Sequence, residues 1–194
     1  KLEHTQKLAA FYNQNLLKDA YSQDHFKKTL TEKLPDYQSS FQEQARNYNH
    51  DWELLVAMGY QESHLNANAV SPTGVRGIMM LTDNTAKAMG VSDRVDPYQS
   101  IGGGARYLEQ VKEDFADVPK TDRIWFALAG YNMGPNAVKS IQRKLRAQGI
   151  DDKSWANIYA YLSENRASNS RYGQAMHYVS NIRSYLETIK TQTV

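Results

Sequence analysis

Glu62 is a candidate general acid because of its place at the end of an expected helix. The apolar residues Trp52, Leu55 and Val56 share one face of that helix, which begins at Asp51 and reaches the polar segment around Glu62. The negative end of the helix macrodipole disfavours a carboxylate, so this position would raise the pKa of Glu62, as would burial among aromatic side chains. A raised pKa suits a proton donor. On its own, however, a glutamate at a helix end is more often a solvated surface residue.

Further polar and glycine-bearing segments follow Glu62, and Ser71 lies nine positions after it. In chain order the segments are Gln61-Glu62-Ser63-His64, Ser71-Pro72-Thr73-Gly74, Gly77-Ile78-Met79-Met80 and Gly130-Tyr131-Asn132-Met133-Gly134. The stretches Asn66–Gly77 and Gly130–Pro135 interrupt the helical pattern, and loops held by a rigid scaffold are where functional sites tend to be built. We therefore expect the chemistry to begin after Asp51.

Apolar side chains recur at helical spacing along nearly the whole chain. The clearest stripes are Phe41, Ala45 and Tyr48; Ile101, Ala105, Leu108 and Phe115; and Val138, Ile141 and Leu145. Helix start signals agree, because Asp96 precedes Pro97, Asp122 precedes residues 124–128, and Pro135 opens the last stripe. No segment alternates as a strand would, so the sequence predicts a mainly α fold.

Composition excludes several classes of protein. A chain of 194 residues with 41% hydrophobic and 23% charged residues is ordinary for one folded domain. The 23 basic and 21 acidic residues are too balanced to indicate a nucleic-acid binder. There is no cysteine for a disulfide framework or a thiolate nucleophile, and the five histidines show no ligand spacing, so we expect neither a metal nor a cofactor.

Two further patterns concern the chain's boundaries and its glycines. No stretch approaches the ~20 apolar residues of a membrane span. Lys1 is not a natural start, so we expect any signal peptide or lipid anchor to be missing from this chain. The run Gly102-Gly103-Gly104 lies within a helical pattern and follows no strand, which predicts close helix packing rather than a phosphate loop.

Together the segments resemble the family 1 lytic transglycosylases over about residues 36–190. That family has a Glu-Ser pair, a serine nine positions later, a Gly-Leu-Met-Gln run and an Ala-Tyr-Asn motif. The stretches around Glu62 and Ser71 look most like a membrane-bound subfamily, whose members carry an additional N-terminal domain similar to periplasmic solute-binding proteins. Three positions depart from the family pattern: Met80 stands where glutamine is usual, Gly130 replaces an alanine, and Gln174 stands where a glutamate is common.

The resemblance implies a lysozyme-like helical fold, of the kind that goose-type lysozymes and lytic transglycosylases share. We expect residues 51–194 to form the catalytic domain and residues 1–50 to form a helical lead-in, which Pro35 divides into two helical stretches. The solute-binding-like domain of the subfamily is expected to be absent from this chain. The resemblance also implies a periplasmic location, with an outer-membrane lipid anchor on the complete protein.

The activity that the resemblance implies is non-hydrolytic cleavage of the β-1,4 bond between MurNAc and GlcNAc in peptidoglycan, which is the expected partner. Most glycoside hydrolases need two carboxylates, whereas this motif set supplies one. Glu62 would therefore serve as the sole acid and base. The products would carry 1,6-anhydro-MurNAc ends.

The expected substrate-binding residues are Ser71, Met79, Met80, Tyr131, Asn132, Gln174 and Tyr178. Ser71 would orient the N-acetyl group, or else it is a turn serine that bonds its own backbone. Tyr131 would hold the carboxyl of Glu62, or else it is a core aromatic, and Tyr178 offers the same choice between ligand contact and packing. Gln174 lacks the charge of a carboxylate, so it would supply only neutral hydrogen bonds.

Two alternatives stay open on the sequence. A goose-type lysozyme would share the fold but hydrolyse its substrate, and it would need a second carboxylate, for which Asp83, Asp93 and Asp96 are candidates by proximity in sequence. A peptidoglycan-binding module without turnover is the second alternative, and Gln174 is the residue that motivates it. The family's Glu-Ser, Tyr-Asn and serine positions are intact, which favours an enzyme.

Overall fold

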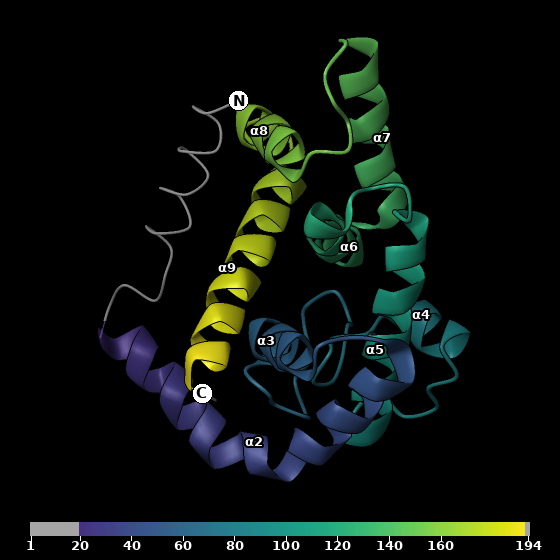
Figure 1. The fold of residues 1–194 in the computed structure, drawn as a ribbon. Coiled ribbons are helices and arrows are strands. Elements are labelled where there is room, and N and C mark those ends of the chain that lie inside the picture. Colours follow the sequence, from purple (N-terminus) through teal and green to yellow (C-terminus); the bar gives the residue numbers. More distant parts are fainter. Residues whose placement is uncertain (1–19, 193–194) are drawn as a thin grey trace. The chain divides into compact units, whose positions relative to one another are not determined.

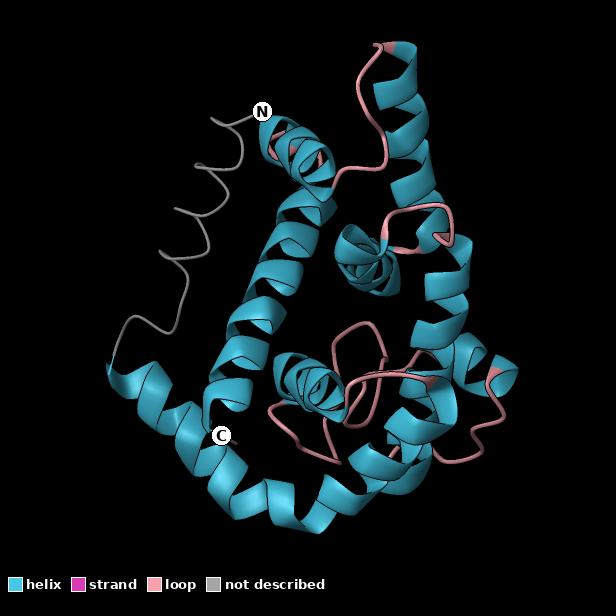
Figure 2. Ribbon diagram, viewed as in Figure 1, coloured by secondary structure: helices cyan, strands magenta, loops and turns pink. Residues whose placement is uncertain are grey.

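The structure, a computed structural model, describes residues 20–192, and these residues are mainly α, as predicted. The helices are α2 (Ala20–Tyr48), α3 (Trp52–Ser63), α4 (Asp83–Ala88), α5 (Pro97–Asp114), α6 (Lys120–Met133), α7 (Pro135–Ala147), α8 (Trp155–Asn165) and α9 (Ser170–Gln192) (Figures 1 and 2). Within this range there is no strand, only isolated antiparallel bridges that pair Val70 with Arg76 and Arg76 with Leu81. No described helix is both long and apolar enough to cross a membrane.

The described residues fall into two compact units. One, called here the α2–α4 unit, comprises residues 20–109 and 182–192; the other, called the α6–α8 unit, comprises residues 110–181. Helices α5 and α9 each contribute residues to both units. The predicted boundary after residue 50 stays a prediction, although α2 and α3 belong to the same unit. Residues 1–19 of the predicted lead-in and residues 193–194 lie outside the described range.

Helix α2 is continuous, so the prediction that Pro35 divides two helical stretches was wrong. Pro35 lies inside the helix, and α2 bends along its length instead of ending (Figure 1). A proline within a helix removes one backbone hydrogen bond and favours a kink. The helix persists because it is held on both sides of the proline, where Phe26 and Phe41 are fully buried.

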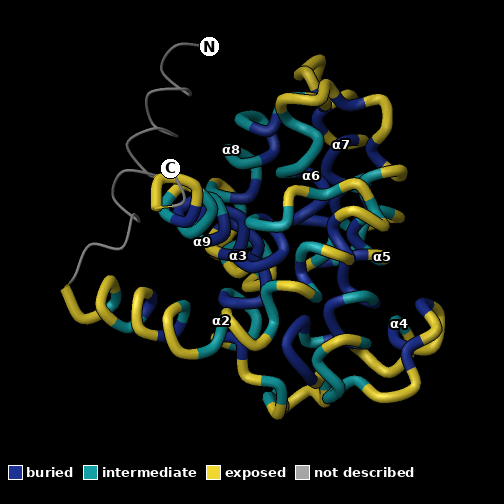
Figure 3. Tube along the Cα trace, turned by 60° about the horizontal axis from the view of Figure 1, so that its bottom comes forward, coloured by how far each residue is buried: buried dark blue, intermediate teal, exposed yellow. Residues whose placement is uncertain are grey.

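Helix α3 runs through the centre of the α2–α4 unit, and Figure 3 colours most of it as buried. Asp51 occupies the N-cap position, as expected, and every residue from Leu54 to Tyr60 is buried. Gly59 allows close approach of neighbouring elements, since a Cβ atom there would lie 3.2 Å from the ring of Phe41 and 3.2 Å from Ile78. The helix that carries Glu62 is therefore fixed by packing on several sides.

Helix α5 confirms two predictions from the sequence. The Asp96 carboxylate accepts a hydrogen bond of 2.9 Å from the Gln99 N–H, so it caps the helix that begins at Pro97. The glycine run serves close packing, because a Cβ at Gly103 would lie 2.5 Å from Val91 and one at Gly104 would lie 2.8 Å from Met79.

The α6–α8 unit is built around aromatic side chains, and its helix boundaries differ from the prediction. The ring centroids of Phe126 and Trp155 lie 6.0 Å apart in the core. Helix α6 begins two residues before Asp122, whose carboxylate instead accepts from the backbone N–H of Trp155 at 2.8 Å. The segment from Gly130 was expected to interrupt the helices, but it forms the end of α6, and only Gly134 (φ 90°) separates α6 from α7.

Replacing Gly104 by alanine should destabilise the fold because the new methyl group has no space. Its Cβ would meet three atoms of Met79 at 2.8–2.9 Å. We expect Gly104→Ala to lower the free energy of unfolding by about 1–3 kcal/mol, measured by urea denaturation.

Gly173→Ala is the matched control, because no atom lies within 4 Å of a Cβ at that position in α9. This control should raise the free energy of unfolding by about 0.5–1 kcal/mol through helix propensity. Equal effects of the two substitutions would contradict the packing role of the glycine run.

Candidate active site

Glu62 is the penultimate residue of α3 and is partly buried. The helix ends because His64 (φ 52°) and Leu65 (φ 58°) both adopt left-handed backbone conformations. The N–H of His64 donates to the Tyr60 carbonyl at 2.8 Å, and that of Leu65 donates to the Gly59 carbonyl at 3.4 Å. The bond from His64, a left-handed residue, to the carbonyl four positions back is that of an αL-type helix cap. The predicted position of Glu62 at a helix C-terminus is thus confirmed.

Ser63 links the end of α3 to the glycine-bearing loop. Its hydroxyl group lies 2.8 Å from the carbonyl oxygen of Ile78 and 3.1 Å from that of Gly59, one turn back in the helix. The residue next to Glu62 therefore holds the helix end against the turn that carries Met79 and Met80. The sequence placed Ser63 in a motif but gave it no such role.

Ser71 closes a tight turn formed by residues 71–75. Its backbone N–H donates to the Val75 carbonyl at 3.0 Å, and its Oγ accepts the N–H groups of Thr73 and Val75, both at 3.2 Å. The hydroxyl groups of Ser71 and Thr73 lie 2.9 Å apart. The turn-serine interpretation therefore describes its local contacts, and its predicted contact with a sugar stays a prediction.

A second turn follows at once and presents Met80. Backbone bonds of 3.1 and 3.0 Å pair Arg76 with Leu81 in both directions, and the Met80 N–H donates to the Gly77 carbonyl at 3.1 Å. Met80 is partly exposed and takes a left-handed backbone conformation (φ 49°), which is uncommon for a residue with a side chain. Met79 differs: its side chain is fully buried. As a predicted substrate contact, Met79 stays untested.

Arg94 contacts both of these turns, although the sequence did not single it out. Its Nη1 donates to the Gly74 carbonyl at 2.9 Å and to the Leu81 carbonyl at 3.0 Å. The only local signal was its place just before the Asp96–Pro97 helix start, and nothing in that pattern points back to residues 71–81.

A cluster of rings packs against the face of α3 that bears Tyr60. Residues two apart in a helix point in roughly opposite directions, so this face lies away from Glu62. Tyr60 is stacked on His64 (ring centroids 4.6 Å apart) and meets Phe26 and Tyr185 edge to face, both at 4.8 Å. Burial, and then the neighbouring tyrosines, raises the pKa of Tyr60 to about 12. The cluster packs against the side of α3 opposite to Glu62.

Helix α2 contributes His25 to this cluster as well as Phe26. The Nε2 of His25 lies 3.3 Å from Nδ1 of His64, and Nζ of Lys33 lies 3.5 Å from the His64 carbonyl oxygen. Burial, then the charges of His25 and Lys33, lowers the pKa of His64. Across residues 20–192, no three His, Cys, Asp or Glu side chains gather as a metal site would require.

The remaining predicted residues belong to the α6–α8 unit. The rings of Tyr131 and Tyr178 are stacked, with centroids 6.5 Å apart and an angle of 8° between planes. Tyr178 is buried and Tyr131 partly exposed, whereas Asn132 and Gln174 are exposed. The guanidinium group of Arg171 donates to the carbonyl of Met133, the last residue of α6. The two tyrosines are thus brought together, and the predicted roles of all four residues stay predictions.

The three candidate second carboxylates all have local partners. Asp83 forms an ion pair of 3.0 Å with Lys87, and the hydrogen bond and charge of that lysine hold the pKa of Asp83 below its usual range. Asp93 accepts from the Val95 N–H at 3.0 Å, and Asp96 caps α5. Each carboxylate therefore serves a helix end or a turn.

Removing the Ser63 hydroxyl should weaken the connection between α3 and the loop. Ser63→Ala leaves the buried Ile78 carbonyl without this donor, so we expect the free energy of unfolding to fall by about 1–2 kcal/mol in urea denaturation. Thr31→Ala is the control, since Thr31 donates to a carbonyl of its own helix on an exposed surface. That change should stay within about 0.5 kcal/mol of wild type, and a similar loss in both variants would contradict the role of Ser63.

The lowered pKa of His64 predicts a stability that depends on pH. As the pH falls below about 6.5, the unfolded chain takes up the proton first, because its histidine has the higher pKa. The stability associated with neutral His64 is therefore present above that pH and is lost as the pH falls through the lower pKa of the folded state.

His64→Gln removes this titration, so its melting temperature should fall less than that of wild type between about pH 7.5 and about pH 5. His177→Gln, outside the ring cluster, is the control for the loss of a histidine side chain. An unchanged pH dependence in His64→Gln would overturn the assignment.

Comparisons with known proteins agree with the fold and the motifs. The family model described as "Transglycosylase SLT domain" matches residues 39–154. Membrane-bound lytic murein transglycosylase F of Shewanella pealeana and that of Stutzerimonas stutzeri are each 42% identical over 174 residues, which is 84% of this chain and 36% of theirs. The chain thus spans about a third of the length of these relatives. The predicted likeness to this subfamily is confirmed.

Solved structures support the predicted lysozyme-like fold. The matches include an inactive mutant of the lytic transglycosylase Slt from Pseudomonas aeruginosa and the 70 kDa soluble lytic transglycosylase from Escherichia coli. Both have a TM-score of 0.57, at 21% and 22% identity, over 77% of this chain and 23% of theirs. Since the family model covers more than half of the residues, the chain belongs to the transglycosylase SLT domain family.

Proposed function

We propose that this chain is the catalytic domain of a lytic transglycosylase that cleaves the MurNAc–GlcNAc bond of peptidoglycan, with Glu62 as its single acid and base. The observation that supports the proposal most is the position of Glu62. It lies in the segment that matches the family model, beside a serine that ties its helix end to the loop of Ser71 and Met80. A packed helix fixes the backbone position from which the carboxyl group extends, and acid catalysis requires such positioning.

In the first step, the protonated Glu62 carboxyl donates its proton to the glycosidic oxygen as the bond to C1 of MurNAc breaks. The carbonyl oxygen of the sugar's own N-acetyl group attacks C1 and forms an oxazolinium ion. The leaving strand departs as a neutral alcohol, and Glu62 becomes a carboxylate. The substrate thus supplies the nucleophile that a second carboxylate provides in most retaining glycosidases.

In the second step, the Glu62 carboxylate takes the proton from the C6 hydroxyl of the same sugar. The C6 oxygen attacks C1, the oxazolinium ring opens, and a 1,6-anhydro ring closes without consuming water. Because this nucleophile is tethered, the reaction depends on holding the sugar in a reactive conformation. Glu62 ends the cycle protonated and ready for the next bond.

Ser71 is suited to orient the N-acetyl group. Its oxygen already accepts two backbone N–H groups of its own turn, which occupy its lone pairs. Its hydroxyl proton is what it has left to offer a ligand, and a carbonyl oxygen would compete for that proton with Thr73. We infer that Ser71 donates to the N-acetyl carbonyl and fixes its direction of attack.

The other predicted contacts follow from exposure. Met80 is partly exposed and offers an apolar surface to a sugar face. The buried side chain of Met79 anchors the same turn in the core. In the α6–α8 unit, Asn132 and Gln174 are exposed and offer neutral hydrogen bonds to glycan. We assign Tyr131 and the stacked Tyr178 to glycan binding by this unit.

A hydrolytic, lysozyme-like reaction is the alternative, and the positions of the acidic residues argue against it. An inverting hydrolase needs a second carboxylate that activates water. Asp83, Asp93 and Asp96 each bind a lysine or a backbone N–H close in sequence. These local roles favour the reaction that uses one carboxylate.

The location and the wider protein also belong to this proposal. Both relatives are named membrane-bound lytic murein transglycosylases. We infer that the whole protein works on peptidoglycan at the periplasmic side of the envelope, held by an outer-membrane anchor. We also infer that an N-terminal domain like that of the subfamily precedes the catalytic part.

Glu62→Gln should abolish turnover while leaving the fold intact, because an amide can neither donate nor recover the proton. Purified sacculi are incubated with wild type and with the variant, and the soluble products are identified by mass spectrometry. We expect 1,6-anhydro-muropeptides from wild type, and a loss of at least about 10³-fold in the variant.

Glu53→Gln is the control for loss of a carboxylate, since Glu53 lies in the first turn of the same helix. It should retain turnover. Reducing sugar ends in place of anhydro ends would favour the lysozyme, and binding without any product would favour the module without turnover. Undiminished turnover in Glu62→Gln would overturn the assignment of the acid.

A further inference from the structure

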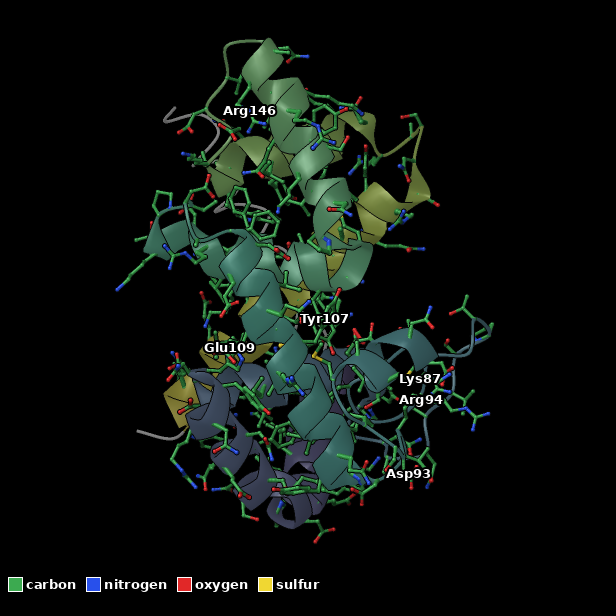
Figure 4. All side chains as sticks on the ribbon, turned by 90° about the vertical axis from the view of Figure 1, so that its right-hand side faces the viewer. Lys87, Asp93, Arg94, Tyr107, Glu109 and Arg146 are labelled. Atoms are coloured by element: carbon green, nitrogen blue, oxygen red, sulfur yellow. The ribbon has the colours of Figure 1, made fainter. Side chains whose placement is uncertain are left out.

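We propose that Arg94 is a positioning residue that holds the Ser71 turn and the Met80 turn in one fixed arrangement for glycan binding. The proposal rests on the proposed function, because it assigns these turns to the glycan surface. Arg94 acts through backbone carbonyl groups and is not itself a catalytic residue. Figure 4 labels it on the segment between α4 and α5, next to Asp93.

The two carbonyl groups that Arg94 binds belong to different turns. Gly74 lies within the turn that Ser71 closes, and Leu81 closes the turn that presents Met80. The Leu81 carbonyl also accepts the backbone N–H of Arg76 at 3.1 Å, so both of its lone pairs are used. One planar guanidinium group thus connects the two turns, in addition to residues 75–76 and the antiparallel bridge between Val70 and Arg76.

The two residues before Arg94 are held by a side chain of α5. The side-chain oxygen of Gln99, in the first turn of α5, accepts the N–H of Ser92 at 3.0 Å and that of Asp93 at 3.2 Å. The loop also approaches Arg94 directly, since a Cβ at Gly77 would lie 1.9 Å from its carbonyl oxygen. Helix α5 therefore fixes the segment, and the segment fixes the loop.

The loop needs such support because its conformation is not the one that its residues prefer. Met80 has a side chain and a φ of 49°, a left-handed conformation that costs free energy and persists where the surroundings hold it. Its turn is closed by few backbone bonds and no regular sheet. Without the guanidinium group, the turn of Ser71 and the turn of Met80 would be held less firmly relative to each other.

The first test compares Arg94→Met with wild type by hydrogen exchange of the backbone amides. Methionine keeps an apolar stem and removes both hydrogen bonds of Nη1. Exchange at the amides of Val75, Met80 and Leu81 should become faster by about tenfold to a hundredfold, because local opening no longer breaks bonds to a charged donor. Arg94→Lys keeps a charge and N–H donors on a shorter side chain without the planar guanidinium group, so it should restore part of the protection.

Arg123→Met is the matched control. Arg123 also donates to two backbone carbonyl groups, those of Ala116 and Val118, in a turn that holds none of the candidate site residues. This variant should leave exchange at residues 75–81 unchanged. Unchanged exchange in Arg94→Met as well would overturn the proposal, and so would a uniform increase along the whole chain, which indicates only a loss of stability.

The second test measures function, with soluble glycan strands as the substrate. Arg94→Met should raise KM by about tenfold and change kcat less, because Glu62 and its helix are untouched. An unchanged KM despite faster exchange of the loop would overturn the positioning role. If wild type releases no anhydro products, the proposed function fails, and binding of the same strands to Glu62→Gln with and without Arg94→Met still decides the role of Arg94.

Discussion

The bond from the Ser63 hydroxyl group to the Ile78 carbonyl is the interaction on which the candidate site depends. Helix α3 ends in two left-handed residues, so the chain leaves the helix at once. Ser63 is the last helical side chain, and it fixes the helix end to the loop. Glu62, one residue earlier, thereby shares a frame with a loop that begins several residues later. The proposed catalysis by one carboxyl group would place a high demand on such a frame, because no second carboxylate would share the task.

Apolar packing and polar bonds support different sides of this frame. Behind α3, the rings of Phe26, Tyr60 and Tyr185 meet edge to face or stacked, and they leave the helix little freedom to turn. Within residues 71–81, the buried apolar side chains are those of Ile78, Met79 and Leu81. The shape of this segment also relies on hydrogen bonds to backbone carbonyl groups. The helix is thus positioned by burial, and residues 71–81 by hydrogen-bond donors together with three buried side chains.

The sequence predicted the features that depend on local chemistry. The cap at Asp96, the proline start of α7 and the helix end at Glu62 all follow from residue type and spacing, and the structure confirms them. Features that depend on tertiary contacts were missed. Pro35 stays within α2 because buried residues hold both halves, and the end of α6 stays helical up to Gly134. The bonds of Ser63 and Arg94 join residues 13 or more positions apart, which no local pattern reveals. The buried position of Met79 likewise depends on a partner in another helix.

That partner is the glycine run of α5, and it has a consequence for how the site can vary. Met79 lies where Gly104 has no side chain, and Leu81 and Val91 approach Gly103 in the same way. The distance between residues 79–81 and α5 is therefore set by the absence of side chains at Gly103 and Gly104. A bulkier residue in the run would lift Met79 and, with it, the neighbouring Met80. The position of Met80, the proposed sugar contact, thus depends on the glycines of α5. A larger residue in the glycine run would require a compensating change at Met79 or Leu81.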